Sequence, residues 1–87
     1  MTATYEVRLA RRAARSLASL ERREQQRIRA ALDILTSNPR PPNCVAWQGE
    51  DCVYRVRVGD YRIVYEVLDL VFLIHVVRIG HPREVYR

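Results

Sequence analysis

The sequence contains no lysine, and this absence restricts the chemistry of any active site. All 15 basic residues are arginine. Arginine keeps its proton at any ordinary pH, so it binds anions well but is a poor general base. The same bias would also arise from the codon usage of a GC-rich genome. Only the two histidines, His75 and His81, carry side chains that change charge near neutral pH.

Long hydrophobic runs are also missing. A membrane-spanning helix needs about 20 apolar residues, but the most apolar segment, residues 67–77, is interrupted by Asp69 and His75. The N-terminus does not resemble a signal peptide, because charges such as Glu6 and Arg8 occupy the place of its apolar region. We therefore expect a cytoplasmic protein with no membrane partner.

Cysteine is scarce. Cys44 and Cys52 are the only two, and they flank an expected loop around Gly49. A metal site would need further Cys or His at ligand spacing, so we expect neither a metal nor a cofactor. A disulfide is possible in principle, but thiols in a cytoplasmic protein usually stay reduced.

Length and charge predict one small basic domain. The chain has 87 residues, of which 48% are hydrophobic, and this predicts a single domain over residues 1–87 with a thin core. Its net charge is +5, with nine arginines and four acids in residues 1–40 but six of each in residues 41–87. The excess charge lies in the N-terminal half. A basic surface suits nucleic acid or an acidic protein partner.

The first half of the chain predicts a strand and two helices. Residues 4–9 alternate with period two, as in a strand. Residues 10–17 are rich in Ala and Arg and predict a short helix. Residues 21–36 show apolar positions at helical spacing, and Pro39, Pro41 and Pro42 then end the helix. The arginines of this second helix fit a solvated face, or contacts with a nucleic-acid backbone.

The second half predicts strands. We expect them at residues 45–47, 54–58, 61–68 and 71–79, with Trp47 buried and the apolar last strand covered on both faces. The fold class is therefore α+β, in the order β-α-α followed by three or four strands. The sheet should be twisted and largely antiparallel, and both helices should pack on one of its faces.

The segment Tyr54-Arg55-Val56-Arg57-Val58-Gly59-Asp60-Tyr61-Arg62-Ile63-Val64-Tyr65 predicts a β-hairpin with a two-residue turn at Gly59-Asp60. In that register Arg57 lies opposite Arg62, and Arg55 lies on the same surface. The alternate residues form an apolar face, namely Val56, Val58, Tyr61, Ile63 and Tyr65. Opposed like charges destabilise a sheet. Three guanidiniums on one rigid surface therefore indicate an anion site, and phosphate has the best geometric match.

This hairpin, the tail Gly80-His81-Pro82-Arg83-Glu84-Val85-Tyr86 and the order of elements resemble the RelE/ParE superfamily of type II toxin–antitoxin toxins, in its RelE branch. The resemblance covers nearly the whole chain. It implies a ribosome-dependent, metal-independent mRNA endoribonuclease that inhibits translation and growth. In that reaction a ribose 2′-OH attacks the adjacent phosphate in line, leaving a 2′,3′-cyclic phosphate and a 5′-OH end.

The resemblance also implies the site residues. The implied catalytic residues are Arg55, Arg57, Arg62, His81, Arg83 and Tyr86. The implied RNA-binding residues are Arg55, Arg57, Arg62 and Arg78. Members of the superfamily often have lysine where Arg55 and Arg57 stand, and Pro82 displaces one of two basic residues that usually follow Gly-His. The match to Arg83 can therefore be shifted by one position.

Two readings remain for proton transfer. His81 lies near the arginines in the sequence and would titrate in the useful range, so it is the candidate base. Alternatively, the arginines alone stabilise the transition state and water moves the proton. We expect His75 to be a core histidine. A two-residue loop at Asp69-Leu70 would instead place it on the arginine side, and a one-residue change in loop length reverses its face.

The resemblance implies a set of partners. These are a cognate antitoxin that covers the basic face, mRNA in the ribosomal A site, ribosomal RNA, and operator DNA only through the toxin–antitoxin complex. Two other functions stay open: a ParE-like inhibitor of DNA gyrase, and a catalytically degenerate toxin that only binds its antitoxin.

Overall fold

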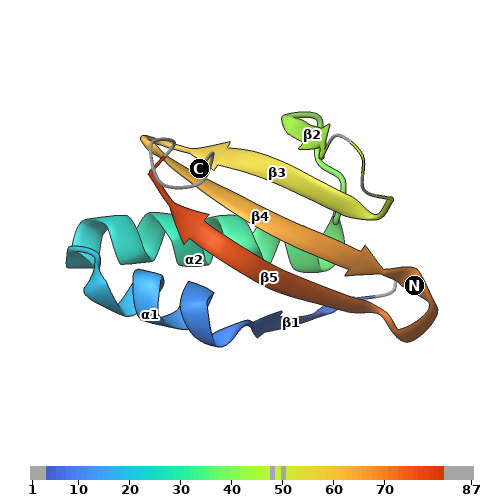
Figure 1. Ribbon diagram of the computed structural model, residues 1–87, viewed down its shortest axis with the longest axis horizontal. Helices are drawn as coiled ribbons and strands as arrows, with labels where there is room; N and C mark the ends of the chain where they lie inside the picture. Colours follow the sequence, from blue (N-terminus) through green and yellow to red (C-terminus); the bar gives the residue numbers. More distant parts are fainter. Residues whose placement is uncertain (1–3, 48, 50, 82–87) are drawn as a thin grey trace.

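The computed structural model describes residues 4–47, 49 and 51–81. In this part of the chain two helices and five strands follow one another as β1 (Glu6–Leu9), α1 (Arg11–Ser19), α2 (Arg22–Ser37), β2 (Cys44–Ala46), β3 (Val53–Val58), β4 (Tyr61–Leu68) and β5 (Leu73–Gly80) (Figure 1). The predicted α+β class and order are confirmed, with four strands after the helices. None of the described helices combines the length and apolar character needed to cross a bilayer.

Each helix buries one apolar stripe. In α1 the buried residues are Ala13 and Leu17, four positions apart. In α2 they are Ile28, Leu32 and Leu35, at the spacing that places side chains on one helix face. The helix ends at Ser37, two residues before Pro39, because proline disfavours helical backbone in the residue before it. Both helices begin and end within two residues of the predicted positions.

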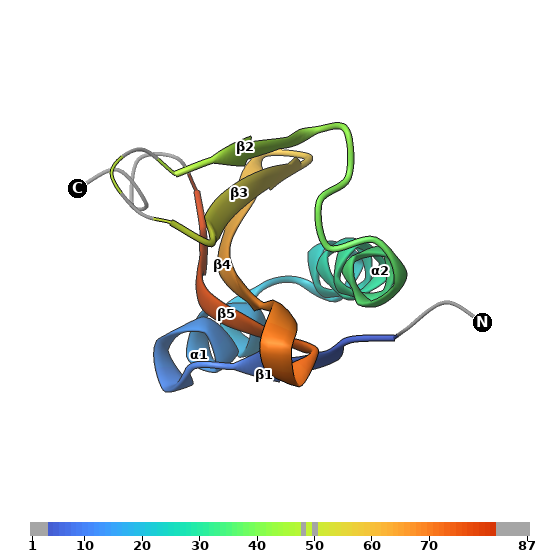
Figure 2. The same ribbon diagram turned by 90° about the vertical axis from the view of Figure 1, so that its right-hand side faces the viewer.

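The strands form one mixed sheet in the order β1-β5-β4-β3-β2. Only β1 and β5 run parallel, and the other neighbours are antiparallel. Figure 2 looks along the sheet and shows its strong twist, with α2 on one side. Between β3 and β4 the pairs are Val58 with Tyr61 and Arg57 with Arg62, as predicted. Gly59 has a φ of +59°, which a tight hairpin turn requires and glycine adopts without strain.

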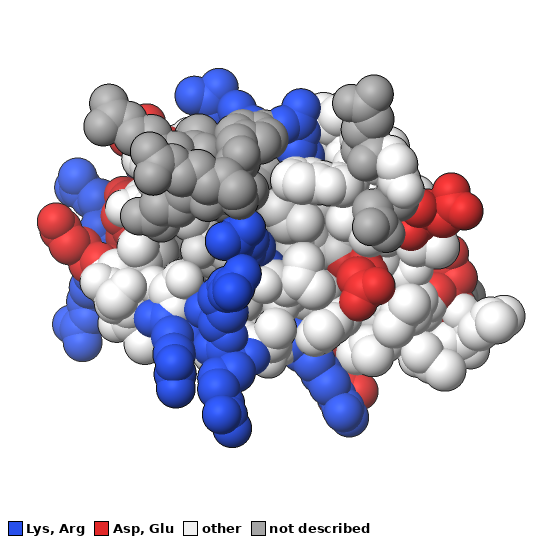
Figure 3. Space-filling model, viewed as in Figure 1, with Lys and Arg blue, Asp and Glu red and all other residues white. Residues whose placement is uncertain are grey.

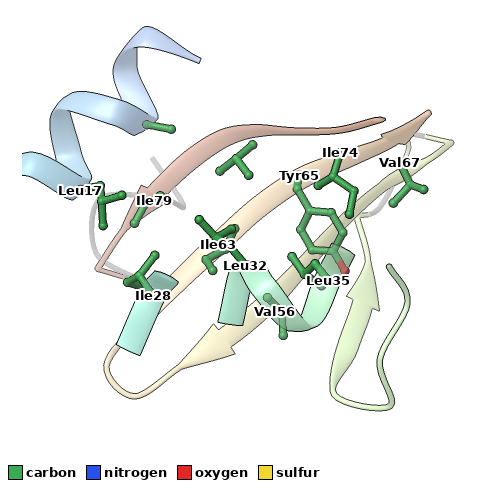
Figure 4. Packing of buried hydrophobic residues seen from close by; sticks show 12 residues of the cluster. Leu17, Ile28, Leu32, Leu35, Val56, Ile63, Tyr65, Val67, Ile74 and Ile79 are labelled. Atoms are coloured by element: carbon green, nitrogen blue, oxygen red, sulfur yellow. The ribbon is translucent and has the colours of Figure 1, made fainter. Parts of the chain in front are cut away.

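The core lies between the helices and one face of this sheet. Val56, Ile63 and Tyr65 are buried in one cluster with the apolar stripes of both helices. Figure 4 shows the ring of Tyr65 beside Leu35 of α2. Val58 and Tyr61 are partly buried and pack against the same cluster, so the predicted apolar face of the hairpin is confirmed.

Two expectations about burial were wrong. Strand β5 is interior to the sheet, but the helices cover only one of its faces, so its alternate residues are only half-buried. Trp47 directly follows the short edge strand β2, where little can cover it, and it is half-buried rather than buried.

The connection from β4 to β5 is longer than expected. Leu68 pairs with Leu73, so four residues separate the strands, and three of them form a 3₁₀ turn at Asp69–Val71. Phe72 follows in the left-handed region with a φ of +51°. The strand therefore begins at Leu73, two residues later than predicted.

A cluster of polar and aromatic side chains fixes this end of the sheet. We call Tyr5, Arg40, Tyr54 and Asp69 the Arg40 clasp. The Arg40 guanidinium donates to Asp69 Oδ2 at 2.7 Å and to the Tyr54 hydroxyl at 2.9 Å, and it lies 5.3 Å from the centre of the Tyr54 ring. The Tyr5 hydroxyl donates to Asp69 Oδ1 at 2.5 Å. The clasp joins the loop after α2 to the residue before β1, to β3 and to the β4–β5 turn.

Candidate active site on the arginine face

The candidate site is the sheet surface turned away from the buried cluster. Four of its basic side chains come from β3, β4 and β5, namely Arg55, Arg57, Arg62 and Arg78, and we call this surface the arginine face. The sheet orders these side chains because residues paired across neighbouring strands share a face. All four predicted RNA-binding residues are therefore brought together on one rigid surface.

The hairpin contributes three of the four guanidiniums. Arg57 lies directly opposite Arg62, and Arg55 lies opposite Val64 in the next row of the same face. Arg57 is exposed and its Nε donates to the Gly59 carbonyl at 3.3 Å, so the turn helps to orient this side chain. Arg55 and Arg62 are half-buried. Partly desolvated guanidiniums on a stiff backbone bind an anion with less loss of side-chain entropy than flexible surface arginines.

A β-bulge brings the fourth arginine to this face. Val64 pairs with Arg78, but the next residue, Tyr65, pairs with Val76. Strand β5 thus carries one extra residue, Val77, and the extra residue changes which face the following side chains occupy. With regular pairing Arg78 would point into the core. Instead it lies in the row Arg55–Val64–Arg78, beside the row that contains Arg57 and Arg62.

His75 is not a core histidine, contrary to the expectation. It pairs across the sheet with Glu66, which has the same orientation along β4 as Arg62 and Val64, so His75 lies on the arginine face. Its side chain is 37% exposed, and its Nδ1 is 2.9 Å from Glu66 Oε1. The connection has four residues, which is an even number like the two of the shorter loop, and side chains along a strand change face with every residue. It therefore gives His75 the face that the shorter loop would have given.

The structure places His81 away from the four arginines. It follows Gly80 at the end of β5, and its ring makes an edge-on contact with Tyr61, with 6.3 Å between ring centres. Tyr61 belongs to the apolar face of the hairpin. His81 also lines a surface hollow with Ser16 and Leu20 of the helical layer. Its catalytic role stays a prediction.

The remaining predicted site residues, Arg83 and Tyr86, lie outside the described residues. Both cysteines are free thiols; Cys52 is exposed and Cys44 half-buried. Within residues 4–47, 49 and 51–81 there is no cluster of three or more His, Cys, Asp or Glu side chains suited to hold a metal ion.

Basic side chains continue beyond the sheet. In Figure 3 they run from the middle of the molecule down across α1, whereas acidic side chains lie on the right, towards the β4–β5 turn, and at the left edge. Helix α1 contributes exposed arginines to this surface, namely Arg11, Arg12 and Arg15. A phosphate chain bound on the arginine face would therefore meet further positive charge on one side, where long-range attraction adds to affinity.

Comparison with known proteins identifies the protein family of this chain. Residues 7–86 match the sequence model of the family described as "ParE toxin of type II toxin-antitoxin system, parDE". A comparison with curated protein sequences found no match.

Solved structures give the same fold. The toxin in an archaeal RelE–RelB complex from Pyrococcus horikoshii OT3 is 27% identical, with a TM-score of 0.79 over 93% of this chain and 98% of that one. The RelBE2 toxin–antitoxin complex from Mycobacterium tuberculosis gives 25% identity and a TM-score of 0.79, over 90% of this chain and 98% of that one. The isolated E. coli RelE toxin gives 23% identity and a TM-score of 0.80, over 94% of this chain and 90% of that one.

Proposed function

The chain belongs to the ParE toxin family of type II toxin–antitoxin systems, and on this basis we propose that it is a ribosome-dependent, metal-independent mRNA endoribonuclease. The observation that carries the proposal is the opposition of Arg57 and Arg62, with Arg55 and Arg78 in the next row of the same face. Guanidiniums arranged in this way match the oxygens of a phosphodiester, and inhibition of a protein target would not require them.

The proposed reaction is attack of a ribose 2′-OH on the adjacent phosphate. The 2′-oxygen forms a bond to phosphorus, the bond to the 5′-oxygen breaks, and the products are a 2′,3′-cyclic phosphate and a 5′-OH end. Negative charge grows on the phosphoryl oxygens in the transition state. Fixed guanidiniums stabilise that charge, and each such donor contributes about 10²–10³ in rate.

Dependence on the ribosome follows from the geometry of the reaction, because in-line attack needs the 2′-oxygen, the phosphorus and the leaving 5′-oxygen in one line. A guanidinium does not accept a proton, so the arginines alone leave 2′-OH activation unassisted. The rate then depends on how well the mRNA is held for in-line attack, and a ribosomal A site supplies such positioning. The exposed arginines of α1 would dock on ribosomal RNA phosphates.

The proposed partner in the resting cell is an antitoxin that covers the arginine face. The similar structures from Pyrococcus horikoshii and Mycobacterium tuberculosis are toxin–antitoxin complexes. A segment with acidic side chains that folds on binding suits a small toxin of net charge +5. Operator DNA would be contacted only through that complex. A co-crystal that leaves Arg55, Arg57 and Arg62 open to solvent would contradict this mode of control.

Cleavage on ribosomes tests the proposed activity. Purified protein is added to translating ribosomes or to the same mRNA free in buffer, with Mg²⁺ or with EDTA, and the new ends are mapped by primer extension. We expect cuts on ribosomes with cyclic phosphate ends and little cutting of free RNA. Arg40→Ala is the matched control for Arg62→Ala, because Arg40 lies in the clasp and not on the arginine face. Efficient metal-dependent cutting of free RNA would contradict the mechanism.

A second candidate is inhibition of DNA gyrase. The sequence model that matches is named after the ParE toxin, and a ParE-like inhibitor of DNA gyrase is the function that this name favours. The two functions separate cleanly in one experiment. Gyrase-dependent DNA breaks with intact mRNA on translating ribosomes would establish the inhibitor and exclude the nuclease.

A further inference from the structure

We propose that His75, oriented by Glu66, is the general base that takes the proton from the attacking 2′-OH. This inference rests on the proposed nuclease function and adds a residue to it. The need for such a group follows from the composition: the four guanidiniums of the arginine face cannot accept a proton, and the chain has no lysine. A titratable side chain on that same face is therefore the natural candidate.

The position of His75 meets the geometric requirement. Its row, which contains Glu66, is adjacent to the row of Val64 and Arg78 on the same face of β4 and β5. Neighbouring rows on one face are about 7 Å apart, because alternate residues of a strand repeat at that distance. A phosphate held between Arg55 and Arg78 would thus lie within reach of the imidazole. The 37% exposure of the His75 side chain leaves it open to a substrate.

Glu66 fixes the ring in the useful tautomer. The distance from His75 Nδ1 to Glu66 Oε1 is 2.9 Å. An ionised carboxylate only accepts hydrogen bonds, so Nδ1 carries the proton and Nε2 keeps its lone pair. A carboxylate that orients a histidine in this way also stabilises the imidazolium formed when the base takes a proton. Glu66 therefore acts as a positioning residue.

The proton balance is complete without a cofactor. The 2′-OH proton moves to Nε2 of His75 as the 2′-oxygen bonds to phosphorus. The bond from phosphorus to the 5′-oxygen then breaks, and water protonates the leaving 5′-oxygen. His75 afterwards releases its proton to solvent.

Two other charged groups lie around the pair of His75 and Glu66. Arg8 of β1 lies beside His75 and donates a hydrogen bond to Glu6, and Arg78 lies further along β5.

A purely structural account competes with this proposal. Opposed His and Glu side chains stabilise neighbouring strands, and that alone would account for the pair. His75→Gln separates the two accounts, because glutamine keeps a hydrogen bond donor for Glu66 but has no base near neutral pH. A structural role is preserved in this variant, whereas a role in proton transfer is lost.

The test measures single-turnover cleavage of ribosome-bound mRNA from pH 5 to 8 for the wild type, His75→Gln, Glu66→Gln and Arg8→Gln, with thermal unfolding of each. We expect the wild-type rate to rise with pH in this range. His75→Gln should lose about 10²–10⁴ in rate and most of the pH dependence. Glu66→Gln should lose up to about 10² through misorientation of the ring. Arg8→Gln should stay within threefold of the wild type.

Three results would overturn the proposal. The first two are a cleavage rate of His75→Gln within threefold of the wild type and an unchanged pH profile in that variant. The third is an equal loss of rate in Arg8→Gln, which would assign the effect to charge. If His75→Gln is poorly folded, the pH profile of Glu66→Gln decides, because this variant keeps the imidazole. Arg62→Ala separates the two levels of inference. If cleavage needs Arg62 but not His75, the proposed nuclease function holds and the proposed base is wrong. If the wild type does not cleave at all, the proposed nuclease function itself is wrong.

Discussion

Arginine occurs in two different surroundings at the two ends of the sheet. In the Arg40 clasp, near the β4–β5 turn, one guanidinium is bonded to both oxygens of Asp69 and to Tyr54. On the arginine face, towards the β3–β4 turn, Arg57 lies opposite a second arginine, Arg62. The first arrangement satisfies the charge within the chain. The second brings like charges together.

The difference separates an arginine paired with a carboxylate from arginines that lie opposite one another. The hydrogen bond from Arg40 holds the pKa of Asp69 below its usual range, and the bond from Tyr5 acts in the same direction. The hydrogen bond to Asp69 in turn raises the pKa of Arg40. Opposed like charges do the reverse and weaken strand pairing. A bound phosphate would remove that penalty, so the arginine face gains most when it is occupied.

The largest effect is expected for Arg62→Ala. Cleavage on ribosomes should fall by about 10²–10³, because one donor to the transition-state charge is lost. The melting temperature should stay the same or rise, since a like-charge pair is removed. Arg40→Ala should show the opposite pattern, with normal cleavage and a lower melting temperature. Equal losses of activity in the two variants would erase the distinction between the two ends of the sheet.

A smaller effect is expected for Arg78→Ala. Removing one phosphate contact should weaken RNA binding and lower the slope of log K against log salt by about 0.7, the value for one contact with a single strand. Titration of a short RNA at several salt concentrations measures the slope. An unchanged slope would mean that the bulge does not serve RNA binding.

Near the clasp, Tyr65→Phe should cost about 1 kcal/mol of unfolding free energy. The Tyr65 hydroxyl donates to the Pro39 carbonyl at 2.8 Å and so holds the loop after α2 against the sheet. The ring itself is buried and would stay in place. Urea unfolding gives the difference, and cleavage should not change. A loss of activity would show that the two ends of the sheet are coupled.

The smallest effect, and one that depends on pH, is expected for Asp69→Asn. Because the folded state lowers the pKa of Asp69, its contribution to stability is fully present above the ordinary carboxyl pKa of about 4 and is lost as pH falls through the lower folded value. The variant should therefore be less stable than the wild type at pH 7 and equal to it at the acid end. Melting temperatures of both proteins from pH 2 to 7 test this. A difference that is constant with pH would exclude the ionised carboxylate as its cause.

Local patterns were sufficient to predict the hairpin. Alternation and the two-residue turn Gly59-Asp60 determine the register, and the register determines that Arg55, Arg57 and Arg62 share a face. The apolar spacing over residues 21–36 likewise predicted a helix with one apolar face, and α2 buries Ile28, Leu32 and Leu35. These features depend on neighbours in sequence, and a strong periodic signal identifies them.

The rest of the candidate site depends on irregular backbone that the sequence does not mark. The β4–β5 connection combines a 3₁₀ turn with a left-handed Phe72, a residue type that rarely takes this conformation. The extra residue of β5 is Val77, in a run of apolar residues that a regular strand would fit equally well. The face of His75 follows from the first irregularity and that of Arg78 from the second. The parallel strand β1, which borders His75, is set by contacts distant in sequence.

At the level of the gene, the bulge accounts for one codon. Loss of the codon for Val77 would leave every earlier pair of β4 and β5 unchanged, including Glu66 with His75. The same deletion would leave a regular strand in which Arg78 directly follows Val76, so Arg78 would still pair with Val64 and the buried Ile79 with Ile63. The bulge therefore accommodates one codon of β5 without changing the face of the side chains before or after it.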